Sequence, residues 1–257
     1  MTRASVAVFG ATGGCAGFAL ANALKAGHSC RTLTRSSPDK LRASLLAKGV
    51  SQKAIDGNLT ALQGDAKDEA MVKQTLTHDG AVVDKILFGI GLQTFVFQFS
   101  LITPISLTDP HVCETTMATI LRAAAELQQE LRSVKKPDLY VISTTGISDG
   151  PRDVSIAFWP FYHWLLKVMH DDKKKMETLV KNSASSPDRG FEQYRVVRAS
   201  LLMDGNGKGL EAIRTGTEAA PEIGYTIDRA DVGLWIYKRW LEPVKDGDSN
   251  GAYTITT

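Results

Sequence analysis

The chain has 257 residues, of which 43% are hydrophobic and 23% are charged, and its formal net charge is +2 at pH 7. These are ordinary values for a globular protein, and the length suffices for one large α/β domain with a sizeable core. The small positive charge, with no dominant basic run, argues against a nucleic-acid-binding protein. The three cysteines are widely spaced and show no metal-ligand pattern, so we expect a reduced cytoplasmic protein without a metal site.

Near the N-terminus, a predicted strand runs into a glycine-rich turn. Residues 5–17, SVAVFGATGGCAG, begin as a buried-type strand, and residues 18–26 have helical composition. Glycine permits both a turn of unusual φ and a close backbone approach to a pyrophosphate, while the helix N-terminus offers free N–H groups. A bare strand-turn-helix connection is the alternative. Because Cys15 begins the helix, we expect a lowered thiol pKa and a reactive thiol unless a cofactor covers it. The turn predicts these cofactor-binding residues: Gly10, Thr12, Gly13, Gly14, Cys15 and Ala16.

Strands and helices alternate along the rest of the chain. Ser37 is expected to cap a helix at 38–48, and Asp109 a helix at 110–131. The alternation predicts right-handed βαβ crossovers, and therefore a Rossmann-like α/β fold with a doubly wound, mainly parallel sheet and helices on both faces. No linker or repeat divides the chain, which predicts a single domain over 1–257 with its substrate side built mainly from 89–110 and 144–230. The other expected strands are 30–34, 60–63, 85–88, 139–143, 194–198 and 253–255. The other helices are 68–76, 172–182 and one that begins at Asp228 or Arg229 and includes Trp240.

Two apolar stretches stand out between these elements. Residues 86–108 carry no charge over a length that could span a bilayer, but glycines, a proline and polar residues interrupt them, and the apolar residues at 95–101 alternate with period two. We interpret this stretch as a buried strand followed by an apolar loop, not as a membrane span. The second stretch, 156–170, is rich in aromatic residues. Both could wall a pocket for a flat hydrophobic ligand, and a packed core or a dimer interface is the alternative.

Several motifs carry a resemblance to a known family. GATGGCA at residues 10–16 resembles the fingerprint of atypical short-chain dehydrogenases, the NmrA-like and biliverdin reductase B-like group, and the order of elements is similar over nearly the whole chain. A weaker likeness connects the layout to fungal polyketide-cluster reductases of the aflatoxin and sterigmatocystin type. Three further motifs, LQGDAKD, FGIG and STTG, match the family's adenine contact, the loop over its cofactor and the active-site end of a strand. The resemblance implies that these motifs supply six more cofactor contacts: Asp65, Ala66, Gly89, Ile90, Ser143 and Thr144.

The end of the second strand bears on the choice between NADH and NADPH. An NAD enzyme usually places an acid there to bind the ribose 2′-hydroxyl, whereas this chain offers Arg35 followed by Ser36, which suits a 2′-phosphate. We therefore expect NADPH as the cofactor, bound at this point by Arg35 and Ser36. A solvated loop cation is the alternative interpretation of Arg35.

Only half of the family's Tyr-x-x-x-Lys catalytic pair is present. Lys173 matches the family's lysine, which would hold the nicotinamide ribose and stabilise negative charge, but Met169 occupies the tyrosine position. A solvated lysine in a charged run is the alternative interpretation of Lys173, and a tyrosine among aromatic residues can equally belong to the core. The candidates for the missing acid are Tyr162 and Ser143, followed by His163, His170 and Thr144.

These features together predict an NADPH-dependent reductase of a small aromatic or polyketide-like carbonyl or enone, with Lys173 and a nearby hydroxyl stabilising the oxyanion. We expect no nucleic-acid or membrane partner, and a homodimer is left open. A non-catalytic NADP(H) sensor of the NmrA-like type is one alternative, which the missing tyrosine favours. A cofactor-retaining isomerase or cyclase is another.

Overall fold

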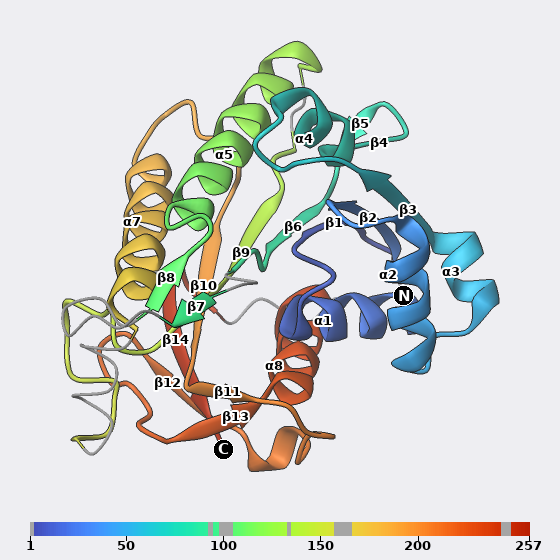
Figure 1. Ribbon diagram of the computed structural model, residues 1–257. Coiled ribbons are helices and arrows are strands. Elements are labelled where there is room, and N and C mark those ends of the chain that lie inside the picture. The colour runs from blue at the N-terminus through green and yellow to red at the C-terminus, as the bar shows by residue number, and fades with distance from the viewer. Residues whose placement is uncertain (1–2, 92–94, 98–104, 133–134, 157–165, 243–247) are drawn as a thin grey trace.

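The structure is a computed structural model that describes residues 3–91, 95–97, 105–132, 135–156, 166–242 and 248–257. An eight-stranded sheet crosses the middle of the molecule (Figure 1). All neighbouring strands in it are parallel except the edge pair β12 and β14. The parallel strands follow the doubly wound order 3-2-1-4-5-6-7, so the predicted fold class is confirmed. From edge to edge the strands are β12 (Arg214–Thr217), β14 (Gly251–Thr256), β10 (Tyr194–Ala199), β9 (Asp138–Thr144), β6 (Lys85–Phe88), β1 (Ser5–Phe9), β2 (Ser29–Thr34) and β3 (Leu59–Gln63).

Helices cover both faces of this sheet, and each face has its own buried cluster of apolar side chains (Figure 1). One face carries α1 (Gly14–Lys25), α2 (Pro38–Ala47), α3 (Gln52–Asn58) and α8 (Arg229–Ile236), which continues as a π-helical turn (Tyr237–Leu241). The other face carries α4 (Glu69–Leu76), α5 (Val112–Glu130) and α7 (Lys167–Ala184). Within the described residues, none of these helices combines the length and the apolar character needed to cross a bilayer.

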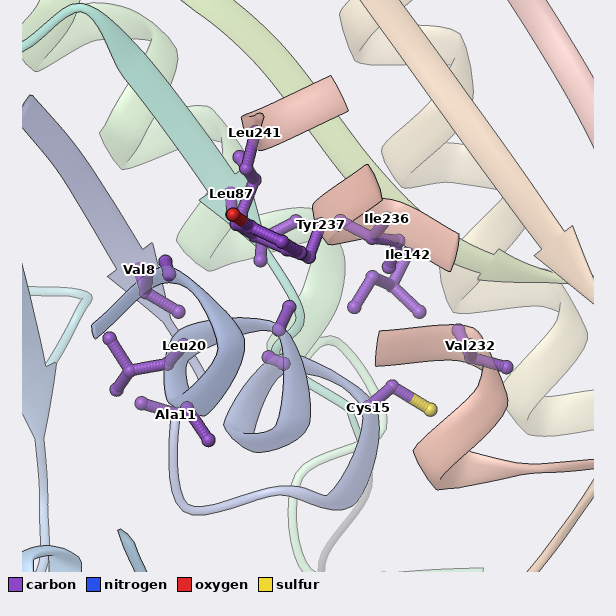
Figure 2. Packing of buried hydrophobic residues seen from close by; sticks show 14 of the residues in the cluster. Val8, Ala11, Cys15, Leu20, Leu87, Ile142, Val232, Ile236, Tyr237 and Leu241 are labelled. Carbon is purple, nitrogen blue, oxygen red and sulfur yellow. The ribbon is translucent and has the colours of Figure 1, made fainter. Parts of the chain in front are cut away.

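The close packing of α1 against α8 brings the end of the chain beside the N-terminal glycine turn. Figure 2 shows Cys15 of α1 next to Val232 of α8. A Cβ added at Gly233 would lie only 2.4 Å from Phe18 Cβ and 2.8 Å from the carbonyl oxygen of Cys15. The two helices can therefore approach this closely only because position 233 has no side chain.

Several short or irregular elements differ from the prediction. The expected helix at 18–26 begins four residues earlier, at Gly14, and the helix expected at 172–182 begins at Lys167. Residues 95–107 contain an antiparallel pair, β7 (Phe95–Phe97) and β8 (Ile105–Leu107), where an apolar loop was expected. Elements that were not predicted include α3, the edge strand β12, the hairpin of β4 (Thr77–His78) and β5 (Ala81–Val82), and the parallel pair β11 (Leu201–Met203) and β13 (Thr226–Asp228).

The start of α5 is capped by a residue distant in sequence, not by the predicted Asp109. Asp109 accepts a hydrogen bond from the N–H of His111 at 3.2 Å, and His111 is the residue that precedes the helix. The carboxylate of Asp172, on α7, accepts from the N–H groups of Cys113 and Glu114, both at 2.9 Å. Asp172 is only 2% exposed. It therefore satisfies two of the free N–H groups at this helix end and binds α5 to α7.

Ser37 precedes α2 as predicted, with Pro38 in the first turn. However, its side chain makes no capping hydrogen bond within the described part of the chain. The proline, whose φ suits a helix start, is therefore the feature of this sequence that marks the helix boundary.

Candidate active site

A cavity of about 350 Å³ opens at the carboxyl edge of the sheet, above the ends of β1, β2, β6 and β9. In a doubly wound sheet this edge, beside the point where the strand order reverses, is where ligands bind. The cavity brings together nearly all of the predicted site residues. They are Gly10, Thr12, Gly13, Gly14, Cys15, Ala16, Arg35, Asp65, Ala66, Gly89, Ile90, Ser143, Thr144 and Lys173.

Two predicted site residues are not among those that line this cavity. The N–H of Ser36 donates to the hydroxyl of Thr34, which does line the cavity, at 3.2 Å. Tyr162 lies outside the described residues, as do His163 and most of the aromatic stretch around it.

The glycine turn between β1 and α1 has the geometry of a phosphate-binding turn. Gly10 has a φ of +84°, and a Cβ there would lie 2.5 Å from the carbonyl carbon of Gly89, so any other residue would be strained and crowded. The N–H of Gly13 donates to the carbonyl of Gly10 at 2.9 Å and closes the turn. Among the residues that the structure describes, no side chain caps α1, and its first turn contains no acidic residue. The positive end of this helix therefore remains available to an anion, which fits a dinucleotide pyrophosphate.

The prediction of a reactive Cys15 is wrong. Its side chain is 6% exposed and packs between α1 and α8 (Figure 2). Burial raises the pKa of the Cys15 thiol to about 12, although the nearby charges of Arg229 and Lys173 act in the opposite direction. The helix N-terminus does not overcome the cost of ionising a thiol in an apolar contact, so Cys15 is a core residue at the cavity wall.

Lys173 is directed into the protein, unlike the two lysines that follow it. Its Nζ donates to the carbonyl oxygens of Ile90 and Ile142, each at 2.9 Å, and lies 5.7 Å from the centre of the Phe88 ring. An ammonium group has three N–H donors, so one remains for a ligand in the cavity. Lys174 instead forms a surface ion pair with Asp149. The interpretation of Lys173 as a solvated surface lysine is therefore wrong.

Ser143 places an unsatisfied hydroxyl at the cavity. It lies near the carboxyl end of β9, is 4% exposed, and its Oγ has no hydrogen-bond partner among the described residues. Leaving such a group without a partner is unfavourable, and most buried hydroxyls have one. A ligand in the cavity could supply it, which makes Ser143 Oγ a candidate contact for a bound cofactor or substrate.

The position of the family's tyrosine is occupied by Met169, which lines the cavity one turn before Lys173. The neighbouring His170, a further candidate acid, also lines it and is 7% exposed. Arg229, at the start of α8, is a charged residue at the cavity that sequence reasoning missed. Its position at the predicted helix start was visible, but nothing in the local sequence connects it with the glycine turn. The other lining residues that were not predicted as site residues are Leu33, Thr34, Gly64, Lys67, Gly91, Val112, Cys113, Thr116, Ile142, Leu166 and Leu202.

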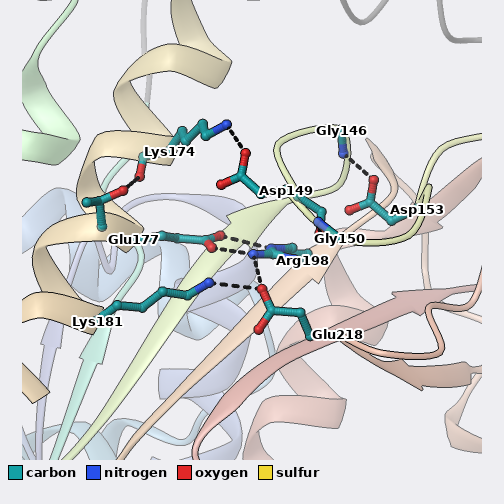
Figure 3. Close-up of polar contacts among 11 residues, drawn as sticks. Gly146, Asp149, Gly150, Asp153, Lys174, Glu177, Lys181, Arg198 and Glu218 are labelled. Atoms are coloured by element: carbon teal, nitrogen blue, oxygen red, sulfur yellow. Dashed lines mark hydrogen bonds and ion pairs between the residues drawn. The ribbon is translucent and has the colours of Figure 1, made fainter. Parts of the chain in front are cut away.

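A buried ion pair fixes α7, the helix that carries Lys173. Arg198 on β10 donates to both carboxylate oxygens of Glu177 on α7, at 2.7 and 3.2 Å, and both side chains are nearly inaccessible to solvent. Glu218 extends the pair, since it accepts from Arg198 at 3.1 Å and from Lys181 at 2.9 Å (Figure 3). Glu177 lies one helical turn after Lys173 on the same side of α7. The ion pair thus holds the face of α7 that directs Lys173 toward the strand ends.

Comparisons with known proteins agree with this site. The family model described as NAD(P)H-binding matches residues 10–243. "Reductase pytE" from Aspergillus terreus is 42% identical over 99% of this chain and 98% of its own length. "Oxidase pynE" from Aspergillus niger is 32% identical over 94% of this chain and 97% of its own length.

Solved structures of low sequence identity share the fold. A short-chain dehydrogenase/reductase from Veillonella parvula in complex with NADP has a TM-score of 0.66 at 12% identity and covers 100% of this chain and 95% of its own. A putative NADH-flavin reductase from Streptococcus pneumoniae has a TM-score of 0.59 at 13% identity, with 98% of each chain covered. The glycine turn, the cavity at the point where the strand order reverses and these relatives lead to the same conclusion: the chain belongs to the NAD(P)H-binding family and is an oxidoreductase.

Proposed function

We propose that the protein is an NADPH-dependent reductase of a small, hydrophobic carbonyl or enone, aromatic or polyketide-like in character. One observation carries the proposal: the glycine turn, the inward-facing Lys173 and the unsatisfied hydroxyl of Ser143 line the same cavity. Apolar side chains, among them Val112, Leu166 and Met169, complete the wall on the side of α5 and α7. Such a wall suits a flat apolar substrate.

The residues of the cavity fall into two groups by role. The turn at Gly10–Gly14 would bind the pyrophosphate, Asp65 and Ala66 the adenine, and Gly89 and Ile90 would cover the cofactor. Ser143 and Thr144 lie at the carboxyl end of β9 and Lys173 lies in the second turn of α7, where the reacting end of the cofactor would be bound. When bound, the reduced nicotinamide supplies the hydride.

Ser143 and Lys173 would stabilise the charge that develops on the substrate. When a carbonyl carbon accepts a hydride, its oxygen gains the negative charge. The hydroxyl of Ser143 and the third N–H of Lys173 can both donate to that oxygen. Because Lys173 is held by the carbonyls of Ile90 and Ile142, its charge is oriented before the reaction begins, which is the condition for effective electrostatic stabilisation.

Arg35 supports NADPH over NADH as the cofactor. It lines the cavity just after β2, on an exposed bend where a 2′-phosphate could meet its guanidinium. We expect Arg35→Asp to weaken NADPH binding by about 10- to 100-fold and NADH binding far less, since only NADPH carries the phosphate. Titration of both cofactors measures this. Arg42→Asp is the matched control, because Arg42 is paired with Asp56 on the same side of the molecule but does not line the cavity. Equal losses for the two cofactors would contradict the assignment.

The direct test of the function is NADPH oxidation with a panel of quinones, aromatic ketones and enones. A reductase should consume NADPH with at least one class, and the product should carry deuterium when the cofactor is deuterated at the transferred position. The absence of turnover with the whole panel, despite tight cofactor binding, would count against the proposal.

A second candidate function is an NADP(H) sensor, which the presence of Met169 favours. A thioether cannot donate a proton, so the position from which the family's tyrosine acts is chemically inert here. A sensor should bind NADPH and NADP⁺ with different affinities and reduce nothing. The substrate panel therefore separates the two functions.

A further inference from the structure

Arg229 lies across the glycine turn between β1 and α1. A Cβ added at Gly14 would lie 2.1 Å from Arg229 Cδ and 3.0 Å from its Cβ and Cγ. The stem of Arg229 therefore occupies the space that a side chain at position 14 would need. Gly14 does more than allow a close backbone approach: it also makes room for an arginine from the far end of the chain.

The position of Arg229 is fixed by the packing of its helix. α8 begins at Arg229, and Gly233, one turn later, is in close contact with Phe18 and Cys15 of α1. Figure 2 shows α8 directly beside Cys15 at the turn. The loop that follows β11 is also held against α8, because the buried carboxylate of Asp231 accepts from the N–H groups of Lys208 and Gly209 at 2.8 and 2.9 Å. The guanidinium is thus attached to a rigid support.

Arg229 forms an ion pair with the carboxylate of Asp204, which a ligand could replace. Its Nη1 donates to Asp204 Oδ1 at 2.7 Å, and the side chain of Asp204 is 90% exposed. Ion pairs of such exposure contribute little to stability, because water screens them and both side chains lose freedom. A phosphate group offers a guanidinium a stronger, bidentate contact.

We propose that Arg229 binds the pyrophosphate of the dinucleotide and exchanges Asp204 for phosphate oxygens when the cofactor enters. The inference rests on the proposed dinucleotide-dependent function, and it assigns a residue that the glycine motif does not contain. The pyrophosphate is common to NADPH, NADH and ADP-ribose. Arg229 therefore sets the affinity for all three ligands, whereas Arg35 would distinguish among them.

The test is a titration of NADPH, NADH and ADP-ribose against Arg229→Gln and Asp204→Asn. We expect Arg229→Gln to weaken all three by a similar factor of about 10- to 100-fold, the range for hydrogen bonds between charged groups. Asp204→Asn removes the competing carboxylate and should tighten all three by about two- to fivefold. Arg214→Gln is the matched control, since Arg214 pairs with Glu222 on the surface in the same way but is not a cavity residue, and it should change nothing.

The outcomes separate this inference from the proposed function. If the unmodified protein binds none of the three ligands, both fail. If it binds them and a folded Arg229→Gln binds them equally well, or loses NADPH alone, only the role of Arg229 is overturned. If Arg229→Gln does not fold, Asp204→Asn provides the test, because it alters only an exposed side chain. Unchanged affinity of Asp204→Asn for all three ligands would overturn the proposed exchange of Asp204 for phosphate oxygens.

Discussion

The two sides of the cavity are held in place by different forces. On the nucleotide side, β1, the glycine turn and α1 are shaped by backbone geometry: a positive φ at Gly10, a bond between Gly13 and Gly10, and close contacts that allow no Cβ. On the side where we propose catalysis, called the catalytic side below, α7 is held by charged side chains that reach other elements. Lys173 contacts the ends of β6 and β9, Asp172 caps α5, and Glu177 pairs with Arg198.

This difference indicates which changes each side should tolerate. The nucleotide side should be sensitive to added volume and indifferent to most charges. The catalytic side should be sensitive to the loss of one charged partner, since each leaves another polar group buried without compensation. The variants below test that division, beginning with the largest expected effect.

Removing Arg198 should have the largest effect on stability. Arg198→Met leaves Glu177 buried without its main partner, and we expect the free energy of unfolding to fall by about 3–5 kcal/mol. Urea denaturation measures this. Arg214→Met, at an exposed pair, should lie within about 1 kcal/mol of the unmodified protein. Adding Glu177→Leu to Arg198→Met should restore part of the loss. If Arg198→Met lowers the free energy of unfolding no more than Arg214→Met does, the buried ion pair does not hold α7 in place.

Removing the charge of Lys173 should reduce catalysis more than cofactor binding. Lys173→Met should slow single-turnover reduction by about 10²-fold or more, a typical loss for one positioned electrostatic group, while cofactor affinity changes less. Lys174→Met is the control, because Lys174 pairs with Asp149 at the surface. Equal rates in both variants would show that Lys173 only joins the ends of β6 and β9.

Adding one methyl group to the glycine turn should destabilise the nucleotide side. We expect Gly10→Ala to lower the free energy of unfolding by about 1–3 kcal/mol, because the new Cβ meets the backbone of Gly89 and the φ is unfavourable. Gly57→Ala is the matched control: a Cβ in α3 meets nothing within 4 Å, so helix propensity should stabilise this variant by about 0.5–1 kcal/mol. Denaturation midpoints that move in the same direction for both would contradict a steric origin.

The smallest effect concerns the pH dependence contributed by His28, a buried histidine that precedes β2 at the amino edge of the sheet, away from the cavity. Its Nδ1 accepts from the N–H of Ala4 at 3.2 Å, and burial lowers its pKa below the usual 6.5. The folded state therefore binds its proton less readily than the unfolded state. This contribution to stability is fully present above pH 6.5 and is lost as the pH falls toward the lowered pKa. Unfolding free energies measured from pH 8 to 5 should decline less steeply for His28→Gln. Identical slopes for His28→Gln and the unmodified protein would show that His28 does not contribute to the pH dependence of stability.

The prediction of the sheet succeeded where the signal is local. The strands at β1, β2, β6, β9 and β10 appear as short apolar runs, and the glycines and prolines between them mark turns and helix starts. The same local reasoning assigned Asp109 to the cap of α5 and a reactive thiol to Cys15. Both assignments were wrong, because Asp172 and the packing of α8 come from distant parts of the chain.

The sequence by itself determined the alternation of strands and helices, the glycine turn and about half of the residues that meet at the cavity. Those features depend on backbone dihedral preferences and on the periodicity of neighbouring side chains, which adjacent residues encode. Only the tertiary structure decided that Asp172 caps α5, that Lys173 faces inward while Lys174 faces solvent, and that Arg229 lies over Gly14. These contacts join segments far apart in the chain. Which residues form these contacts depends on how the helices pack on the sheet, and no local sequence pattern indicates that packing.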